Sequence, residues 1–256
     1  MLTIRREQMD ILNQAAERRF RQEMLEHSKA FAPELCDVIG DRQVQAANAA
    51  ALERARGYGF SNCGPLRLFI ELTLLLGSGF DTDPQYATIA APLICEGDEM
   101  ERAEQIHLRY LSYYHQVTGV DGENVDQSLE RLLLLSTAHI DFSLSFGLSW
   151  ICEDLRHVFP EKVAYMGETA AELLLSEAYT ASREHHLTSG RGESLMTALM
   201  FTFGHHCHTD MLYPWIDRTL SDPMIKDADA RTDRLERKAM TWLRHVISRN
   251  AERKRV

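Results

Sequence analysis

The chain has 256 residues, 45% of them hydrophobic, and a formal net charge of −10. That length can bury a core in one large domain or two small ones, and the acidic balance argues against binding to nucleic acid or an anionic membrane. The five cysteines include no C-x-x-C pair, which is typical of reduced thiols and predicts a cytoplasmic protein without a secretory signal.

Hydrophobic periodicity predicts helices along most of the chain. Residues 5–30 place apolar side chains every three or four positions along one face, with charged and polar side chains on the other. Residues 98–117 and 229–249 repeat this pattern. We therefore predict a long helix in each of these three segments.

The middle of the chain has a more ambiguous pattern. Residues 141–152, DFSLSFGLSWIC, alternate apolar and polar side chains as a half-buried strand would. Residues 132–151 form the most apolar run and are long enough to span a bilayer, yet they contain His139 and Asp141. Such polar side chains favour a buried helix over a membrane span.

The sequence resembles itself after a shift of 127 residues. GSGFDTDPQY (77–86) aligns with GHHCHTDMLY (204–213), and further upstream Gly40 aligns with Gly167 and Pro33 with Pro160. Glycine and proline mark positions at which backbone geometry restricts the residue. We therefore predict an all-α protein built from two tandem, similar multi-helix units, residues 1–125 and 126–256, that share one interface. The repeat also predicts a helix over residues 135–156, despite its alternating pattern.

The aligned segments are interpreted as two structural corners. Each glycine follows an apolar helix, where a left-handed cap is common, and each aspartate can accept the free amide hydrogens of the helix that follows. A tyrosine three residues later then packs back on the corner. The predicted corner residues are Gly77, Asp83 and Tyr86 in the first unit, and Gly204, Asp210 and Tyr213 in the second.

The second corner contains three histidines and a cysteine in four consecutive positions, 205–208. Adjacent side chains diverge, so at most two or three of them can share one ion, whereas structural zinc usually has four converging ligands. We interpret the histidines as solvated or capped loop residues whose replacement leaves folding nearly unchanged, and we predict no cofactor. The alternative is a metal site formed by His205, His206, His208 and Asp210.

The sequence contains no P-loop, no G-x-S-x-G and no H-E-x-x-H motif. Glu104 and His107 form an E-x-x-H pair, but a di-iron bundle needs such pairs on two helices together with further carboxylates. The sequence therefore predicts a protein that is not an enzyme.

Several segments of the first half resemble a known bacterial family. They are LTIRREQMDILNQAAERRFRQEMLEH, AFAPE, ARGYGF, LLGSGFDTDPQY and MERAEQIHLRYLSYYHQVTG. The family consists of small helical proteins encoded in type VI secretion gene clusters, near spike proteins, effectors and adaptors. The resemblance covers residues 3–120 and is looser in the second half, which departs from the pattern at residues 205–208. It implies a role with a secreted toxin.

Three functions remain open at this point. The first is a non-enzymatic adaptor or chaperone that binds a type VI effector, and the second is a cytosolic immunity protein that neutralises a cognate toxin. The third is a metal-binding protein or metalloenzyme that uses the loop from His205 to Asp210. The first is the function we predict, and the oligomeric state is left open.

Charge suggests where such a partner binds. Residues 81–130 contain eleven acidic and two basic side chains, whereas residues 231–256 contain nine basic and three acidic ones. Charge runs are commonly solvated helix faces, but a concentration of carboxylates also speeds capture of a basic partner. The predicted partner-binding residues are Asp98, Glu99, Glu101 and Glu104, with Tyr110, Tyr113 and Tyr114 as anchoring aromatics.

Overall fold

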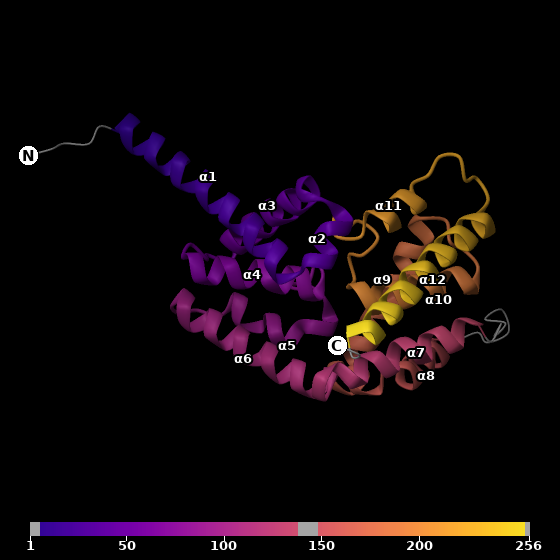
Figure 1. Cartoon of the computed structure of the whole chain (residues 1–256). Helices are drawn as coiled ribbons and strands as arrows, with labels where there is room; N and C mark the ends of the chain where they lie inside the picture. The colour runs from indigo at the N-terminus through magenta and orange to yellow at the C-terminus, as the bar shows by residue number, and fades with distance from the viewer. Residues whose placement is uncertain (1–5, 138–147, 254–256) are drawn as a thin grey trace, which may run out of the picture.

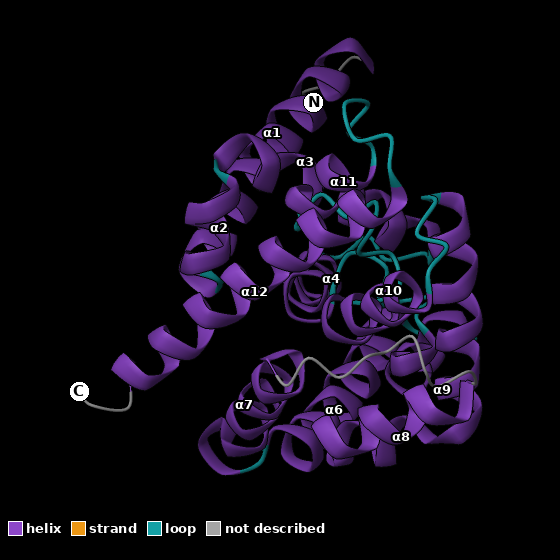
Figure 2. Cartoon of the chain, turned by 90° about the vertical axis from the view of Figure 1, so that its right-hand side faces the viewer, coloured by secondary structure: helices purple, strands orange, loops and turns teal. Residues whose placement is uncertain are grey.

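The computed structural model of the chain describes residues 6–137 and 148–253, and within these two ranges every regular element is helical (Figures 1 and 2). The all-α class predicted from periodicity is thus confirmed. Among the helices described, none combines the length and the hydrophobicity that a membrane span needs.

The first half begins with a long helix, α1 (Arg6–Phe31), followed by a helix pair and an apolar helix that ends at the first corner. Its remaining elements are α2 (Pro33–Ile39), α3 (Asp41–Gly57), α4 (Cys63–Leu76), η1 (Pro84–Tyr86), α5 (Ala87–Ala90), η2 (Ala91–Ile94) and α6 (Glu99–Thr118). Asp98 begins α6, because its carboxylate accepts hydrogen bonds from the amides of Met100 and Glu101.

The second half again places an apolar helix before a corner. Its elements are η3 (Val120–Gly122), α7 (Glu123–Thr137), α8 (Leu148–Val158), α9 (Pro160–Glu184), α10 (Gly190–Phe203), α11 (Pro214–Leu220) and α12 (Ala228–Arg253). Residues 135–137 and 148–156 of the helix predicted over 135–156 are helical, and residues 138–147 lie outside the described residues.

Helix boundaries in the two halves recur at the spacing of the sequence repeat. The first residues of α4 and α10 are 127 residues apart, and so are their last residues. The last residues of α3 and α9 are also 127 residues apart. Gly40 separates α2 from α3 with φ 81° and ψ 156°, and Gly167 interrupts α9 with φ 78° and ψ 169°. Only glycine adopts this backbone conformation easily, which explains why both positions have glycine.

Two large hydrophobic clusters form most of the interior, one in each half, and a small third cluster contains Leu25, Cys36 and Val44. The first is built mainly on α3, α4 and α6, and the second on α9, α10 and α12. They meet where α6 packs against α9, with the ring centroids of Tyr113 and Tyr165 5.0 Å apart. The two corners lie at this junction and position the polar groups described next.

Candidate functional site

The two corners bind each other through their buried aspartates. One carboxylate oxygen of Asp83 accepts the Gln85 amide at 2.9 Å, and the other accepts the amide of His205 from the second corner at 2.7 Å. Asp210 does the same, at 2.8 Å from the amides of Leu212 and Ser78. Each aspartate thus holds both its own turn and the opposite corner.

The corner glycines are required by this close contact. Gly77 has φ 98°, and a Cβ there would lie 2.5 Å from the carbonyl oxygen of Phe203. Gly204 has φ 94°, and a Cβ there would lie 3.0 Å from the carbonyl oxygen of Leu76. Their ψ angles of 158° and 157° are extended, so these glycines end α4 and α10 without the usual left-handed cap that we predicted.

Tyr86 is buried and Tyr213 is partly buried, and only Tyr86 lies within a helical turn. Tyr86 ends η1 and stacks edge-on against Tyr113, with centroids 5.7 Å apart. Tyr213 is the residue that precedes α11, and its ring lies 4.4 Å from that of Phe203. Asp210 therefore caps a turn before α11 rather than the helix itself.

A buried lysine beside the corners was not singled out by the sequence. Lys162 Nζ donates to the carbonyl oxygen of Phe201 and to the hydroxyl of Tyr86, and it lies 4.4 Å from the centroid of the Phe201 ring. Burial lowers the pKa of Lys162 to about 8, against the opposing effect of the Asp83 charge. The ammonium stabilises the C-terminal end of α10, where free carbonyls concentrate negative charge.

Of the two roles predicted for the histidines, solvated or capped, His205 does not have the first. Its side chain is buried, with Nδ1 2.8 Å from a Glu177 oxygen and Nε2 3.1 Å from the hydroxyl of Thr82. The ring of His206 stacks on it at 3.8 Å between centroids. The backbone turn directs these rings onto the first corner, because Gly79 leaves the space that they occupy. Sequence periodicity has no signal for such a contact.

The remaining members of this loop separate from one another. His208 faces His185, with centroids 5.4 Å apart, and Cys207 is buried in the second core, where burial raises its thiol pKa. Within residues 6–137 and 148–253, no three His, Cys, Asp or Glu side chains are placed to hold one metal ion. The four candidate ligands His205, His206, His208 and Asp210 are therefore not brought together.

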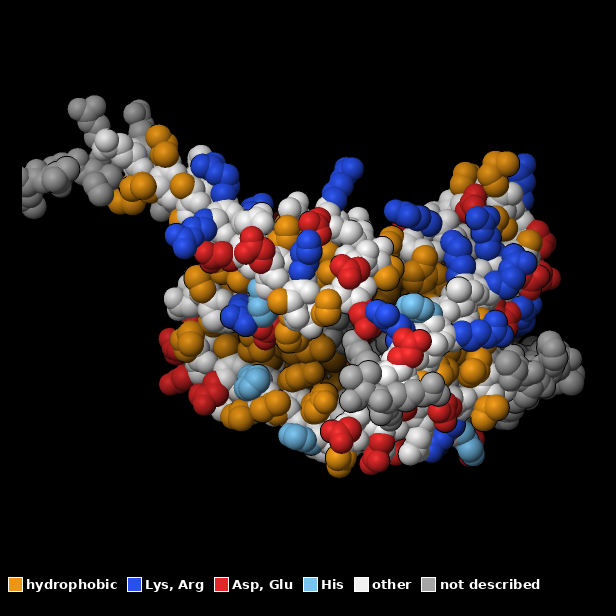
Figure 3. Space-filling view, viewed as in Figure 1, with side chains coloured by type: hydrophobic (Ala, Val, Ile, Leu, Met, Phe, Trp, Pro, Cys, Tyr) orange, Lys and Arg blue, Asp and Glu red, His pale blue; other side chains and the backbone are white. Residues whose placement is uncertain are grey.

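The predicted partner-binding residues have different roles in the structure. Glu99 accepts four hydrogen bonds from Ser61 and Asn62, which lower the pKa of its carboxyl group. Tyr113 is only 8% exposed and belongs to the core. Glu101, Glu104 and Tyr114 are exposed, Tyr110 is partly buried, and Asp98 caps α6. Figure 3 shows acidic side chains at the left-hand end of α6, where the helix begins.

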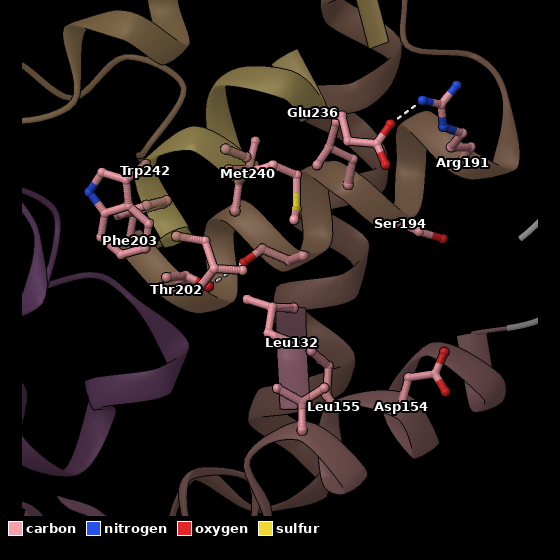
Figure 4. A pocket seen from close by; sticks show the side chains of 16 residues that line it. Leu132, Asp154, Leu155, Arg191, Ser194, Thr202, Phe203, Glu236, Met240 and Trp242 are labelled. Carbon is pink, nitrogen blue, oxygen red and sulfur yellow. Dashed lines mark hydrogen bonds and ion pairs between the residues drawn. The ribbon is translucent and has the colours of Figure 1, made fainter. Parts of the chain in front are cut away.

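An apolar pocket of about 130 Å³ opens between α7, α8, α10 and α12 (Figure 4). Its apolar lining includes Leu195 and Leu199 of α10 and Trp242 and Leu243 of α12. The charged side chains that line it are Asp154, Arg191 and Glu236, and Arg191 pairs with Glu236 and, at 2.6 Å, with Asp233. Sequence reasoning did not find this pocket, since its walls come from four separate helices.

No protein-family model, curated protein or solved structure matches this chain. The buried titratable groups Asp83, Asp210 and Lys162 are bound to backbone groups at the junction of the two halves, and they do not line the apolar pocket. An apolar group is what the lining of this pocket suits best, with the Arg191 and Glu236 pair available to a polar group beside it.

Proposed function

We propose that this chain is a non-enzymatic binding protein of the adaptor or chaperone type, which holds a secreted effector or toxin protein. The observation that carries the proposal is the apolar pocket between α10 and α12, because an open apolar site with a few paired charges at its end suits a protein side chain. The resemblance of residues 3–120 to proteins of type VI secretion clusters supports a secreted effector or toxin as the partner.

We also propose that the chain arose by tandem duplication of one helical unit, residues 1–125 and 126–256. The corners support this, because Asp83 and Asp210 make equivalent contacts at positions 127 residues apart. A second equivalence comes from two arginines. Arg102 and Arg231 each donate to the carbonyl of a helix-ending residue at 3.0 Å, Tyr58 and His185 respectively, and these two residues are also 127 apart.

The binding proposal is tested by filling the pocket. Ala198 lines it on α10, so Ala198→Phe should occupy the space and weaken binding to the product of a neighbouring effector gene at least ten-fold in calorimetry. Ala46→Phe on the exposed face of α3 is the matched control and should bind as the wild type does. Equal affinity for both variants, at unchanged melting temperatures, would reject the pocket as the binding site.

Deletion of the gene separates a loading role from an immunity role. If the protein loads an effector, the producer should grow normally and fail to deliver that effector. If growth of the producer stops and is restored by deleting the toxin gene as well, the protein is an immunity protein and the loading role is wrong.

A further inference from the structure

The apolar stripe along α1 is covered over only part of its length. Met9, Leu12, Ala16, Phe20 and Met24 recur at intervals of three or four residues, so they share one face of the helix. Met24 is buried and Phe20 packs against the first core, but Met9 is 44% and Leu12 is 55% exposed. Figure 1 shows this N-terminal part extending beyond the other helices. We call residues 6–17 the arm.

An isolated helical segment of this length is marginal in water, because helices shorter than about 12–15 residues depend on packing for their stability. The arm therefore requires an apolar surface to cover Met9 and Leu12. Among the described residues, its own chain offers none nearby, since α1 is a single helix that carries the arm away from the body (Figure 1).

A matching surface lies between α4 and α6. Helices α4 and α6 pack against each other, and Leu68 and Tyr110 lie partly buried against the first core. Leu75 of α4 and Leu111 and Tyr114 of α6 are 45%, 37% and 41% exposed. Figure 3 shows hydrophobic side chains gathered in a hollow at this place. We call this surface the α4–α6 groove.

In the second half α7 covers part of the equivalent groove, and the apolar pocket is the part that stays open. Leu195 and Thr202, 127 residues after Leu68 and Leu75, line the apolar pocket of Figure 4. Arg102 of α6 and Arg231 of α12, which make equivalent hydrogen bonds, are 129 residues apart. At this spacing Leu111 corresponds to Met240 and Tyr114 to Leu243, and Met240 and Leu243 also line the pocket.

The covering element there is α7. Its Leu132 lines the pocket, and α7 packs against both α8 and α12. The last residues of α1 and α8 are 127 residues apart, so α8 corresponds to the packed part of α1. Helix α7 precedes α8 in the chain, as the arm precedes the packed part of α1. At the same spacing residues 133–137 of α7 correspond to residues 6–10 of the arm, which are instead continuous with α1, and the α4–α6 groove is left open.

We propose that the arm of one copy lies in the α4–α6 groove of a second copy, and that the exchange is reciprocal. In this dimer α1 stays one long helix and reaches the second copy, whereas α7 and α8 are two helices that pack against each other within one chain. Exchange of an identical element produces a closed two-fold dimer in which both stripes and both grooves are covered. The proposal concerns self-association and does not depend on the nature of the effector.

The test uses two variants that each add one cysteine to a background of Cys63→Ser, Cys95→Ser and Cys152→Ser, in which only the buried Cys36 and Cys207 remain. Leu12→Cys on an untagged chain is mixed with Leu111→Cys on a chain carrying a tag that changes its gel mobility. Mild oxidation should then yield a disulfide-linked dimer of intermediate size. Gln14→Cys, exposed on another face of the arm, replaces Leu12→Cys as the matched control and should give at least ten-fold less of this product.

A second measurement covers the case in which no disulfide forms. The wild type should have twice the chain mass of 29.3 kDa in light scattering, and Met9→Asp with Leu12→Asp should reduce it to the chain mass, with a loss of helical content no greater than that of the arm. A wild type that is monomeric at every concentration would overturn the proposal. So would a dimer that survives the two aspartates, or a disulfide within one chain carrying both Leu12→Cys and Leu111→Cys, which would show that the arm closes on its own groove.

Discussion

Asp83 and Asp210 illustrate how two short side chains can join two halves of a protein. Both are buried, and each carboxylate accepts two backbone amides, one from its own turn and one from the opposite corner. Burial raises the pKa of Asp210, and the amides of Leu212 and Ser78 oppose that rise. The two amides thus offset part of the cost of burying the charge.

Replacing Asp83 by alanine should therefore cost more than the loss of an ordinary helix cap. The buried amides of Gln85 and His205 would both lose their acceptor, and we expect the free energy of unfolding to fall by roughly 2–5 kcal/mol, since each buried unpaired amide costs about 1–3 kcal/mol. Urea unfolding measures the change. Asp98→Ala, at an exposed cap with a similar pair of amides, is the control and should cost about 1 kcal/mol. Equal losses would contradict the role of burial.

Lys162 gives a second prediction, on the dependence of stability on pH. Its pKa is about 8 in the folded protein and 10.5 in the unfolded chain, so between these values the unfolded chain binds more protons. This contribution to the free energy of unfolding is fully present above 10.5 and is lost as pH falls towards 8. Relative to Lys162→Met, the wild type should gain about 1 kcal/mol per pH unit between 8 and 10.

The comparison with Lys162→Met isolates the lysine. Other buried groups titrate in the same range with the opposite sign, since burial raises the pKa of Cys207 and of Tyr213. Chemical unfolding of both proteins at several pH values cancels these shared contributions. A constant difference between them across pH 8–10 would show that Lys162 does not lose its proton in this range.

The stacked histidines predict sensitivity to acid. Burial, assisted by the neighbouring His205 and Arg54, lowers the pKa of His206 from 6.5 to about 4. The unfolded chain takes up this proton near pH 6.5 and the folded protein only near 4, so stability is retained above 6.5 and lost as pH falls between these values. We expect His206→Asn to reduce this loss by roughly 1–2 kcal/mol, since the ring is only half-buried.

The measurement is the free energy of unfolding at pH 7 and at pH 4.5, for the wild type and for His206→Asn. The matched control is His107→Asn, which changes an exposed histidine on α6. If both variants lose stability with acid as the wild type does, His206 is not the group that titrates.

At the scale of single elements, α6 combines structural and exposed acidic residues on one helix. Asp98 caps its first turn and Glu99 binds the start of α4 through Ser61 and Asn62. Only Glu101 and Glu104 of the predicted acidic set are exposed without one of these structural roles. A charge test of the partner surface must therefore spare Asp98 and Glu99.

Reversing Glu101 and Glu104 to lysine should slow association with a basic effector several-fold at low salt, because exposed charges act mainly on the rate of encounter. The defect should shrink as salt rises, given a Debye length of about 10 Å at 0.1 M. Stopped-flow measurements at two salt concentrations would show it. Reversal of Glu172 and Glu184 on α9 is the control, and an equal effect of both pairs would assign the attraction to net charge alone.

At the scale of the whole molecule, each half supplies side chains that bind groups of the other half. Tyr113 of α6 stacks on Tyr165 of α9, and Gln85 donates to the carbonyl of Met200 across the same junction. Each corner supplies the acceptor for the other, so neither half has a satisfied corner by itself. The halves should therefore unfold in one transition, in spite of their separate hydrophobic clusters.

Two probes of urea unfolding check this cooperativity. Far-ultraviolet circular dichroism follows the helices of both halves, whereas tryptophan fluorescence follows the second half alone, because Trp150, Trp215 and Trp242 all belong to it. The two signals should give the same midpoint. Two separate midpoints would show that the halves unfold independently and that the shared corners do not couple them.

The sequence by itself determined the helices of α1, α6 and α12, because their apolar periodicity is local, and it located the corners, because glycine and aspartate at fixed spacing restrict the backbone. Only the tertiary structure decided that Asp83 binds the corner opposite, that His205 is buried against Thr82, and that Tyr113 lies in the core. These contacts join residues more than 40 positions apart or depend on which helix covers a given face. A side chain's partners across such distances follow from how the halves pack, and no local pattern encodes that packing.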